Sequence, residues 1–229
     1  MKKEFEHPEL GVIRITVNRR ARRIIMRAGD DGINVTVPAY ATYSDIENAL
    51  AKHGGRLKEI QLGKTKVIDA GFTAGEGNFR ICLQEYKGGK FMWVHNGHTA
   101  TLMCPEGTDY KEKQPWLRKV ITNAIHEEAR DMLPPRLEAL AEREGFKYSR
   151  CSVRNSHSRW GSCSGKGNIS LSIYLVLLAD ELIDYVLLHE LCHTVEMNHG
   201  ERFWAMLDKV CKGNSRKIRG RLKKHTPDI

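Results

Sequence analysis

The sequence predicts an α+β fold class, with a β-rich N-terminal unit followed by a domain in which helices lie on a small sheet. Two observations predict this division. Short runs of alternating apolar and polar residues, typical of half-buried strands, dominate the first hundred residues. Longer runs with apolar residues at helical spacing dominate the rest of the chain. We therefore expect one unit over residues 1–110 and a second over residues 111–229.

The N-terminal unit should consist mainly of strands separated by turn residues. The expected strands cover residues 12–17, 24–26, 33–37, 79–86 and 90–94, and the turns contain Asn18-Arg19-Arg20, Gly29-Asp30-Asp31-Gly32 and Lys87-Gly88-Gly89. One helix is expected among them. Ser44 and Glu47 have the spacing of a capping box, which predicts a helix from Ser44 toward Ile60.

The second domain should begin with helices. Pro115 suits the first turn of a helix that continues to Leu133, where Pro134-Pro135 should break it. A second helical stretch should run to Glu144 and end at Gly145.

A small sheet and two more helices are expected after Gly145. Strands are expected over residues 148–154 and 169–173. One helix should contain the apolar run 182–188 and continue through residues 189–193, and another should cover residues 201–211. Asp180 can serve as the N-cap of the first of these helices, and Phe203, Trp204 and Leu207 have core spacing in the second. The segment Arg159–Ser164 should be an edge strand or a loop beside a cleft.

The most informative motif is His189-Glu190-Leu191-Cys192-His193. Residues four apart share one face of a helix, so His189 and His193 can present two imidazoles to one divalent metal. Glu190 lies beside these ligands but is not needed as one, so it can act as a general base toward metal-bound water. The motif therefore predicts a metal-dependent hydrolase.

A third ligand must come from a segment that turns back toward the helix. We favour His199, because Asn198 and Gly200 on either side of it tolerate left-handed backbone conformations. Glu196 and Glu201 are the alternatives, since a carboxylate is the third ligand in thermolysin-like sites. Three imidazoles and a water favour zinc, or else nickel, over magnesium and calcium.

The composition is that of a globular protein, with 41% hydrophobic and 28% charged residues. The sequence has no apolar run of 18 residues and no leader-like N-terminus, so we expect a cytoplasmic protein without a membrane partner. Its six cysteines lack the spacing of a disulfide framework and should be reduced. We expect Cys192 to be a small buried hydrophobe rather than a nucleophile or a fourth metal ligand.

The formal net charge is +9, from 37 basic and 28 acidic residues. Much of the excess lies in two segments without acidic residues, Leu10–Gly29 and Lys209–Lys224. Such segments are most often solvated surfaces, but they also suit phosphate-bearing partners. Nucleic acid is therefore a candidate partner.

Several segments together resemble the YgjP-like family of predicted metal-dependent hydrolases, which is related to the SprT and WLM metallopeptidases. The resemblance rests on Arg159-Trp160-Gly161-Ser162-Cys163-Ser164, Gly167-Asn168-Ile169, Ile183-Asp184-Tyr185-Val186, the motif at 189–193, Asn198-His199-Gly200 and Phe203-Trp204. It implies a zincin-type catalytic domain with His189, His193 and His199 as metal ligands and Glu190 as the general base.

Hydrolysis also needs a group that stabilises negative charge on oxygen in the transition state. Arg159, His157 and Tyr174 are candidates, and no spacing singles out one of them.

The favoured function is that of a zinc-dependent metallopeptidase. Two alternatives remain: a nucleotide phosphohydrolase of the nucleoside triphosphate pyrophosphatase type, and a nucleic-acid-associated protein with a non-catalytic zinc site. A peptidase should have a groove beside an exposed strand edge, whereas a nucleotide hydrolase should have a closed pocket ringed by arginine and lysine. A non-catalytic site should have a fourth protein ligand.

Overall fold

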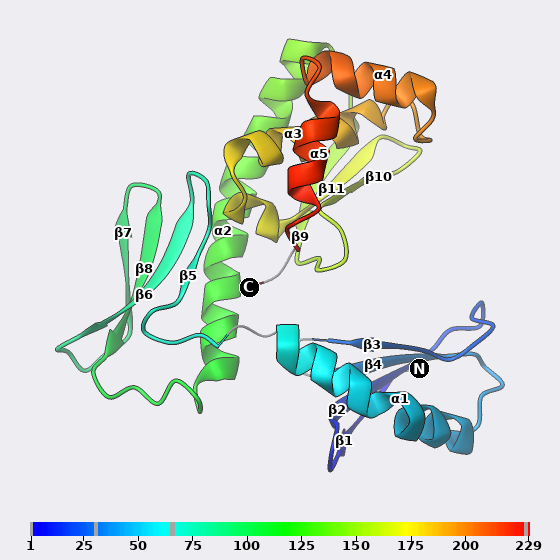
Figure 1. The fold of residues 1–229 in the computed structure, drawn as a ribbon, viewed down its shortest axis with the longest axis vertical. Helices are drawn as coiled ribbons and strands as arrows, with labels where there is room; N and C mark the ends of the chain where they lie inside the picture. The colour runs from blue at the N-terminus through cyan, green and yellow to red at the C-terminus, as the bar shows by residue number, and fades with distance from the viewer. Residues whose placement is uncertain (1, 30–31, 65–66, 227–228) are drawn as a thin grey trace. The chain divides into compact units, whose positions relative to one another are not determined.

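The computed structural model describes residues 2–29, 32–64, 67–226 and 229, and it confirms the α+β class (Figure 1). The chain forms two compact units, Met1–Lys66 and Val67–Ile229. The first unit contains β1 (Lys2–His7), β2 (Gly11–Val17), β3 (Ile25–Ala28), β4 (Gly32–Val37) and α1 (Tyr43–Lys64). The second unit contains β5 (Thr73–Ala74), β6 (Arg80–Tyr86), β7 (Met92–Asn96), β8 (Thr99–Pro105), α2 (Gln114–Glu144), β9 (Arg150–Arg154), β10 (Gly161–Cys163), β11 (Asn168–Ser172), the 3₁₀ helix η1 (Ile173–Leu177), α3 (Asp180–Cys192), α4 (Glu201–Val210) and α5 (Ser215–Leu222).

A four-stranded sheet and α1 form the first unit. The strand order is β1-β2-β4-β3, with β2 and β4 parallel and the other neighbours antiparallel. Alternate residues of the two central strands, such as Ile13, Ile33 and Val35, form one core with Leu50 of α1. Because β4 lies between β2 and β3, the turn at residues 18–20 does not join neighbouring strands.

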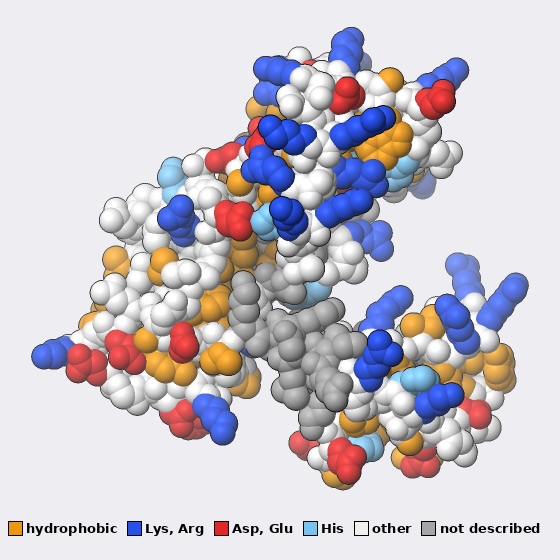
Figure 2. Space-filling model, viewed as in Figure 1, with side chains coloured by type: hydrophobic (Ala, Val, Ile, Leu, Met, Phe, Trp, Pro, Cys, Tyr) orange, Lys and Arg blue, Asp and Glu red, His pale blue; other side chains and the backbone are white. Residues whose placement is uncertain are grey.

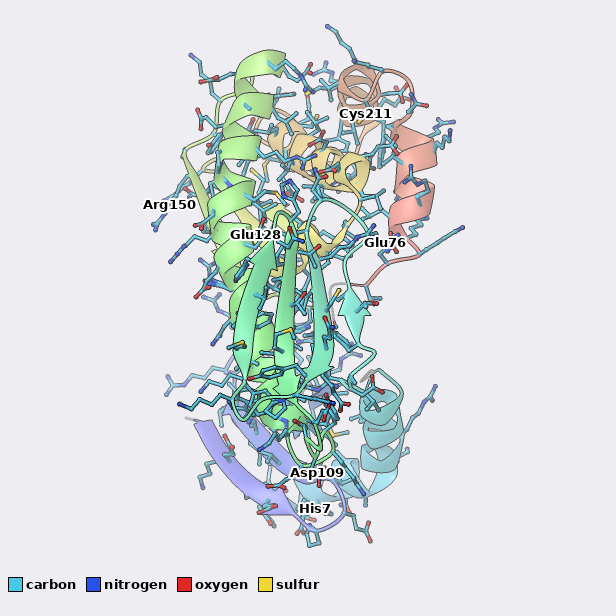
Figure 3. All side chains as sticks on the ribbon, turned by 90° about the vertical axis from the view of Figure 1, so that its left-hand side faces the viewer. His7, Glu76, Asp109, Glu128, Arg150 and Cys211 are labelled. Carbon is cyan, nitrogen blue, oxygen red and sulfur yellow. The ribbon has the colours of Figure 1, made fainter. Side chains whose placement is uncertain are left out.

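The second unit begins with a sheet of the same connectivity. Its order is β5-β6-β8-β7, again with a parallel central pair and antiparallel outer pairs. This sheet packs on α2 (Figure 3), and Ile81 and Leu102 share a buried cluster with Ile121 of α2. The units therefore divide after Lys66 rather than at residue 110, because α2 supplies the apolar surface that buries this sheet.

The long helix α2 continues through Pro134-Pro135, where we had predicted a break. A proline inside a helix costs about 3 kcal/mol, through a lost hydrogen bond and a steric conflict. Buried residues recur at helical spacing on both sides of the prolines, from Leu117 to Ala141, and each large apolar side chain contributes about 1.5–3 kcal/mol on burial. The burial of these apolar side chains along α2 therefore outweighs the cost of its two prolines. The helix ends at Gly145, as predicted, in a left-handed conformation with φ of 77°.

The start of α1 differs from the predicted one. The helix begins at Tyr43, and its capping pair is Thr42 and Asp45 rather than Ser44 and Glu47. The Asp45 amide donates to Thr42 Oγ1 at 3.2 Å, and the Thr42 amide donates to Asp45 Oδ2 at 2.8 Å. The carboxylate of the capping box is therefore that of Asp45, which lies two residues before Glu47 and has a shorter side chain.

An ion-pair network joins α3 to α2. Arg136 of α2 donates through Nη1 to Asp180 and through Nε to Asp184, each at 2.6 Å. The side chain of Asp180 is thereby engaged with Arg136, and Ala179 takes the N-cap position that we had predicted for Asp180.

The third sheet has the order β10-β11-β9, with β11 parallel to β9 and antiparallel to β10. β10 is an edge strand, which confirms one of the two expectations for the segment Arg159–Ser164. The core of this unit joins buried residues of β11, η1, α2 and α3. A further helix, α5, lies in the segment that we had treated only as a basic tail. In the part of the chain that the structure describes, no helix is both long and apolar enough to cross a membrane.

We expect Arg136→Gln to lower the free energy of unfolding of the second unit by about 1 kcal/mol, because two partly exposed ion pairs are lost. Arg130→Gln on the same helix is the control, since the Arg130 side chain is 66% exposed and pairs with the adjacent Asp131. Urea unfolding followed by tryptophan fluorescence measures the difference, because all four tryptophans lie in the second unit. An equal decrease in the free energy of unfolding in both variants would show that the ion pairs of Arg136 do not stabilise the unit.

Candidate metal centre

Three histidines converge on one point. His189 lies in the last turn of α3, His193 is the residue at its C-cap, and His199 precedes α4. Their Nε2 atoms are 3.1 Å apart for the pair 189–199 and 3.2 Å apart for the other two pairs. Nitrogens bound at 2.0–2.1 Å to a tetrahedral zinc lie about 3.4 Å from one another. The three imidazoles therefore fit one metal ion.

The other candidate ligands do not join this cluster. Among the described residues, no carboxylate and no thiolate belongs to the group formed by the three histidines. Glu196 and Glu201 thus stay outside it. Cys192 is fully buried, and burial raises the pKa of its thiol to about 12, as for a small apolar side chain in the core.

The surroundings orient the His193 ring and favour the neutral form of His189 and His199. His193 Nδ1 lies 3.0 Å from the carbonyl oxygen of Glu196. Since a carbonyl oxygen can only accept, Nδ1 carries a proton, and this hydrogen bond orients the ring so that Nε2 faces the other two imidazoles. Burial, followed by the neighbouring histidines, lowers the pKa of His189 to about 3, and burial likewise lowers the pKa of His199. Neutral imidazoles are the form that binds a metal.

The return of the chain to His199 does not use the left-handed conformations that we had expected. Neither Asn198 nor Gly200 has a positive φ, and Gly200 is extended. Instead the Gly200 amide donates to the Asn198 carbonyl oxygen at 2.8 Å, and the Glu196 amide donates to the Cys192 carbonyl oxygen at 2.9 Å. Tight backbone hydrogen bonds therefore turn the chain.

Phe203 and Trp204 of α4 support the imidazoles. The Phe203 ring is fully buried, and its centroid lies 4.5, 4.9 and 4.7 Å from those of His193, His189 and His199. Trp204 Nε1 donates to the carbonyl of His199 at 3.0 Å. We had predicted only a core role for both residues. The sequence signal for their contact with the histidines was their position four and five residues after His199, at the start of a helix.

Glu190 is a buried carboxylate beside the triad. It is 5% exposed, and its Oε2 atom has no hydrogen-bond partner among the described residues. Burial raises the pKa of Glu190 to about 7, and the positive charge of Arg159 opposes this rise. Gly161 of β10 makes room for it, because a Cβ atom there would lie 2.6 Å from Glu190 Oε1 and 2.7 Å from its Cγ. The sequence carried no signal for this close approach.

A pocket of 360 Å³ opens beside His189 and Glu190. Residues from three segments line it. Helix α3 contributes Tyr185, Val186, His189 and Glu190, and the segment that leads into β10 contributes Arg159, Trp160 and Gly161. Helix α5 and the residues after it contribute Arg219, Leu222, Lys223 and His225. The contribution of α5 was missed, because a run of basic residues is typical of a solvated surface.

The structure brings one of the three transition-state candidates to this pocket. Arg159 lines it together with Glu190. Tyr174 is buried, and its hydroxyl lies 3.1 Å from His157 Nε2. Neither Tyr174 nor His157 is among the residues that line the pocket.

We expect Gly161→Ala to displace the Glu190 carboxylate and to lower the free energy of unfolding by about 1–3 kcal/mol, as overpacking does. Gly165→Ala is the matched control, because a Cβ atom at Gly165 would meet nothing within 4 Å. Urea unfolding measures the loss, and a crystal structure of the variant shows the displacement. An unmoved Glu190 at unchanged stability would contradict the expectation.

Three comparisons with known proteins bear on the family to which the chain belongs. The model of the YgjP-like family, metallopeptidase domain, matches residues 22–225. The crystal structure of the metallopeptidase zymogen of Pyrococcus abyssi abylysin shares 27% identity over 41% of this chain and 94% of that chain, with a TM-score of 0.37. No curated protein matches the sequence. Because the family model spans most of the chain, the protein belongs to the YgjP-like metallopeptidase family and is a metal-dependent hydrolase.

Proposed function

We propose that the protein is a zinc metallopeptidase in which His189, His193 and His199 hold the metal and Glu190 is the general base. One observation carries the proposal: three Nε2 atoms lie within 3.2 Å of one another beside a buried carboxylate. The absence of a fourth ligand among the described residues supports an open catalytic position over a closed structural one.

The residues of the site divide the chemistry among them. When bound, zinc supplies a Lewis acid that polarises a peptide carbonyl and lowers the pKa of water. Glu190 takes a proton from the attacking water and passes it to the leaving amine nitrogen. Its raised pKa suits both steps, since a group that titrates near neutral pH can accept and donate a proton. Arg159 stabilises the negative charge that develops on the carbonyl oxygen.

The edge strand β10 supports a polypeptide substrate. Among the described residues, no strand pairs with its outer side, and its first residue, Gly161, lies against Glu190. An extended peptide that pairs with this edge would pass next to the general base. A second cavity of 540 Å³ lies along the same sheet and shares Arg159 with the pocket at Glu190. It offers room for further residues of the substrate.

The nucleotide phosphohydrolase remains the second candidate, because Arg159, Arg219 and Lys223 line the pocket at Glu190. These groups would suit a polyphosphate. Binding of nucleic acid by Leu10–Gly29 or Lys209–Lys224 stays a prediction. The second of these segments contributes Arg219 and Lys223 to the pocket.

Removal of a ligand should remove the metal. We expect protein purified without added metal to contain about one zinc or nickel ion per chain, and His193→Ala or His199→Ala to lose most of it. His126→Ala, at an exposed position of α2, should keep the wild-type content. Elemental analysis by mass spectrometry measures the occupancy. Unchanged occupancy in the triad variants would refute the ligand assignment.

Glu190→Gln should keep the metal but lower hydrolysis by about 10²–10⁴, the usual contribution of general acid–base catalysis. Glu142→Gln, at an exposed position, is the control for the loss of a carboxylate. Rates are measured on an unfolded polypeptide and on nucleoside triphosphates, each with and without chelator. A Glu190-dependent activity on triphosphates alone would support the second candidate, and an active Glu190→Gln would refute the mechanism.

A further inference from the structure

Three basic residues of α5 and its C-cap, Arg219, Arg221 and Lys223, lie in two different settings. Arg221 is not among the residues that line the pocket, and it pairs with Glu181 of α3. Arg219 and Lys223 line the pocket at Glu190, and Arg159 faces them from the start of β10. Figure 2 shows Lys and Arg side chains gathered over α5 and its surroundings, with hydrophobic side chains between them. Helix α5 and its C-cap residue thus present two positive groups toward the candidate catalytic residues.

The positive charge inside the pocket is not neutralised by ion pairs. In the described ranges, no carboxylate forms an ion pair with Arg159, Arg219 or Lys223. Of the described residues that line the pocket, Glu190 is the one that is acidic. A fourth basic group, His225, has a carboxylate nearby, since its Nε2 lies 3.8 Å from Glu76, which follows β5 (Figure 3).

The pocket also orients and strengthens these charges. The Arg219 guanidinium lies over the Trp204 ring at 4.8 Å from its centroid, which restricts the side chain while its N–H groups stay available. Trp160, Tyr185 and Leu222 supply apolar walls. A charge next to apolar walls is less screened than one in open water. An anion in this pocket would therefore meet a preorganised set of donors.

We propose that this pocket binds a carboxylate group of the peptide substrate through Arg219 and Lys223, close to the scissile bond, while Arg159 acts on the carbonyl oxygen. The inference rests on the proposed peptidase function, which makes a peptide the ligand. A peptide offers a carboxylate from two sources, its C-terminus or an Asp or Glu side chain. Arginine binds either one with two parallel hydrogen bonds. A volume of 360 Å³ suits one or two residues of a substrate.

The test measures binding and so does not require hydrolysis. Full-length, zinc-loaded Glu190→Gln protein is titrated by calorimetry with four acetylated Ala/Leu pentapeptides. One has a free C-terminal carboxylate and is compared with its C-terminal amide. Another amide has a central Glu and is compared with its Gln counterpart. We expect at least one carboxylate peptide to bind at least about tenfold more tightly than its neutral partner, as for a hydrogen bond to a charged group.

The matched variants show which residues cause the preference. In the same Glu190→Gln background, Arg219→Gln with Lys223→Gln should abolish it, whereas Arg221→Gln should preserve it, because Arg221 pairs with Glu181 outside the pocket. Both changed positions are exposed, so the variants should fold. The peptide pair that shows the preference identifies the source of the carboxylate.

Three results would overturn the proposal. The first is equal affinity for carboxylate and neutral peptides. The second is a preference that survives Arg219→Gln with Lys223→Gln, which would assign it to the metal. The third is a nucleoside triphosphate that binds more tightly than every peptide and whose binding requires Arg219 and Lys223. Failure of the peptidase function itself is recognised separately, by a wild-type protein that binds these peptides yet hydrolyses no polypeptide.

Discussion

The burial of α3 on nearly all sides determines where the candidate catalytic side chains lie. Helices α2, α4 and α5 and strand β10 all contact it. Apolar residues on different faces of the helix, such as Leu182, Leu187 and Leu188, are all buried. Rotating or shifting such a helix would expose several of them at about 1.5–3 kcal/mol each. The orientation of His189 and Glu190 is therefore a consequence of core packing.

A second consequence is that polar groups are buried in an apolar setting. Glu190 Oε2 and His189 Nδ1 have no hydrogen-bond partner among the described residues, and Phe203 lies against all three imidazoles. An unpaired buried carboxylate is costly, and its raised pKa reflects that cost. A divalent cation held by the triad would offset it. The same low-dielectric surroundings would make each charge at the site more effective on a substrate.

The candidate site combines features of two kinds of hydrolase. The free edge of β10 suits an extended peptide, whereas the basic groups of α5 suit an anion. A carboxylate-bearing peptide reconciles the two within one substrate. In that interpretation part of the positive net charge contributes to specificity next to the reacting bond, and the remainder, such as Arg221, pairs within the fold.

The sequence by itself determined the features that depend on local spacing. The positions of His189 and His193 follow from helical periodicity, and the end of α2 follows from the left-handed preference of Gly145. Only the tertiary structure decided the continuity of α2 through its prolines, the division of the units after Lys66, the contact of Gly161 with Glu190 and the place of α5 at the pocket. These features depend on burial between segments far apart in the chain. Such long-range packing can outweigh local preferences by several kcal/mol, and no local pattern records it.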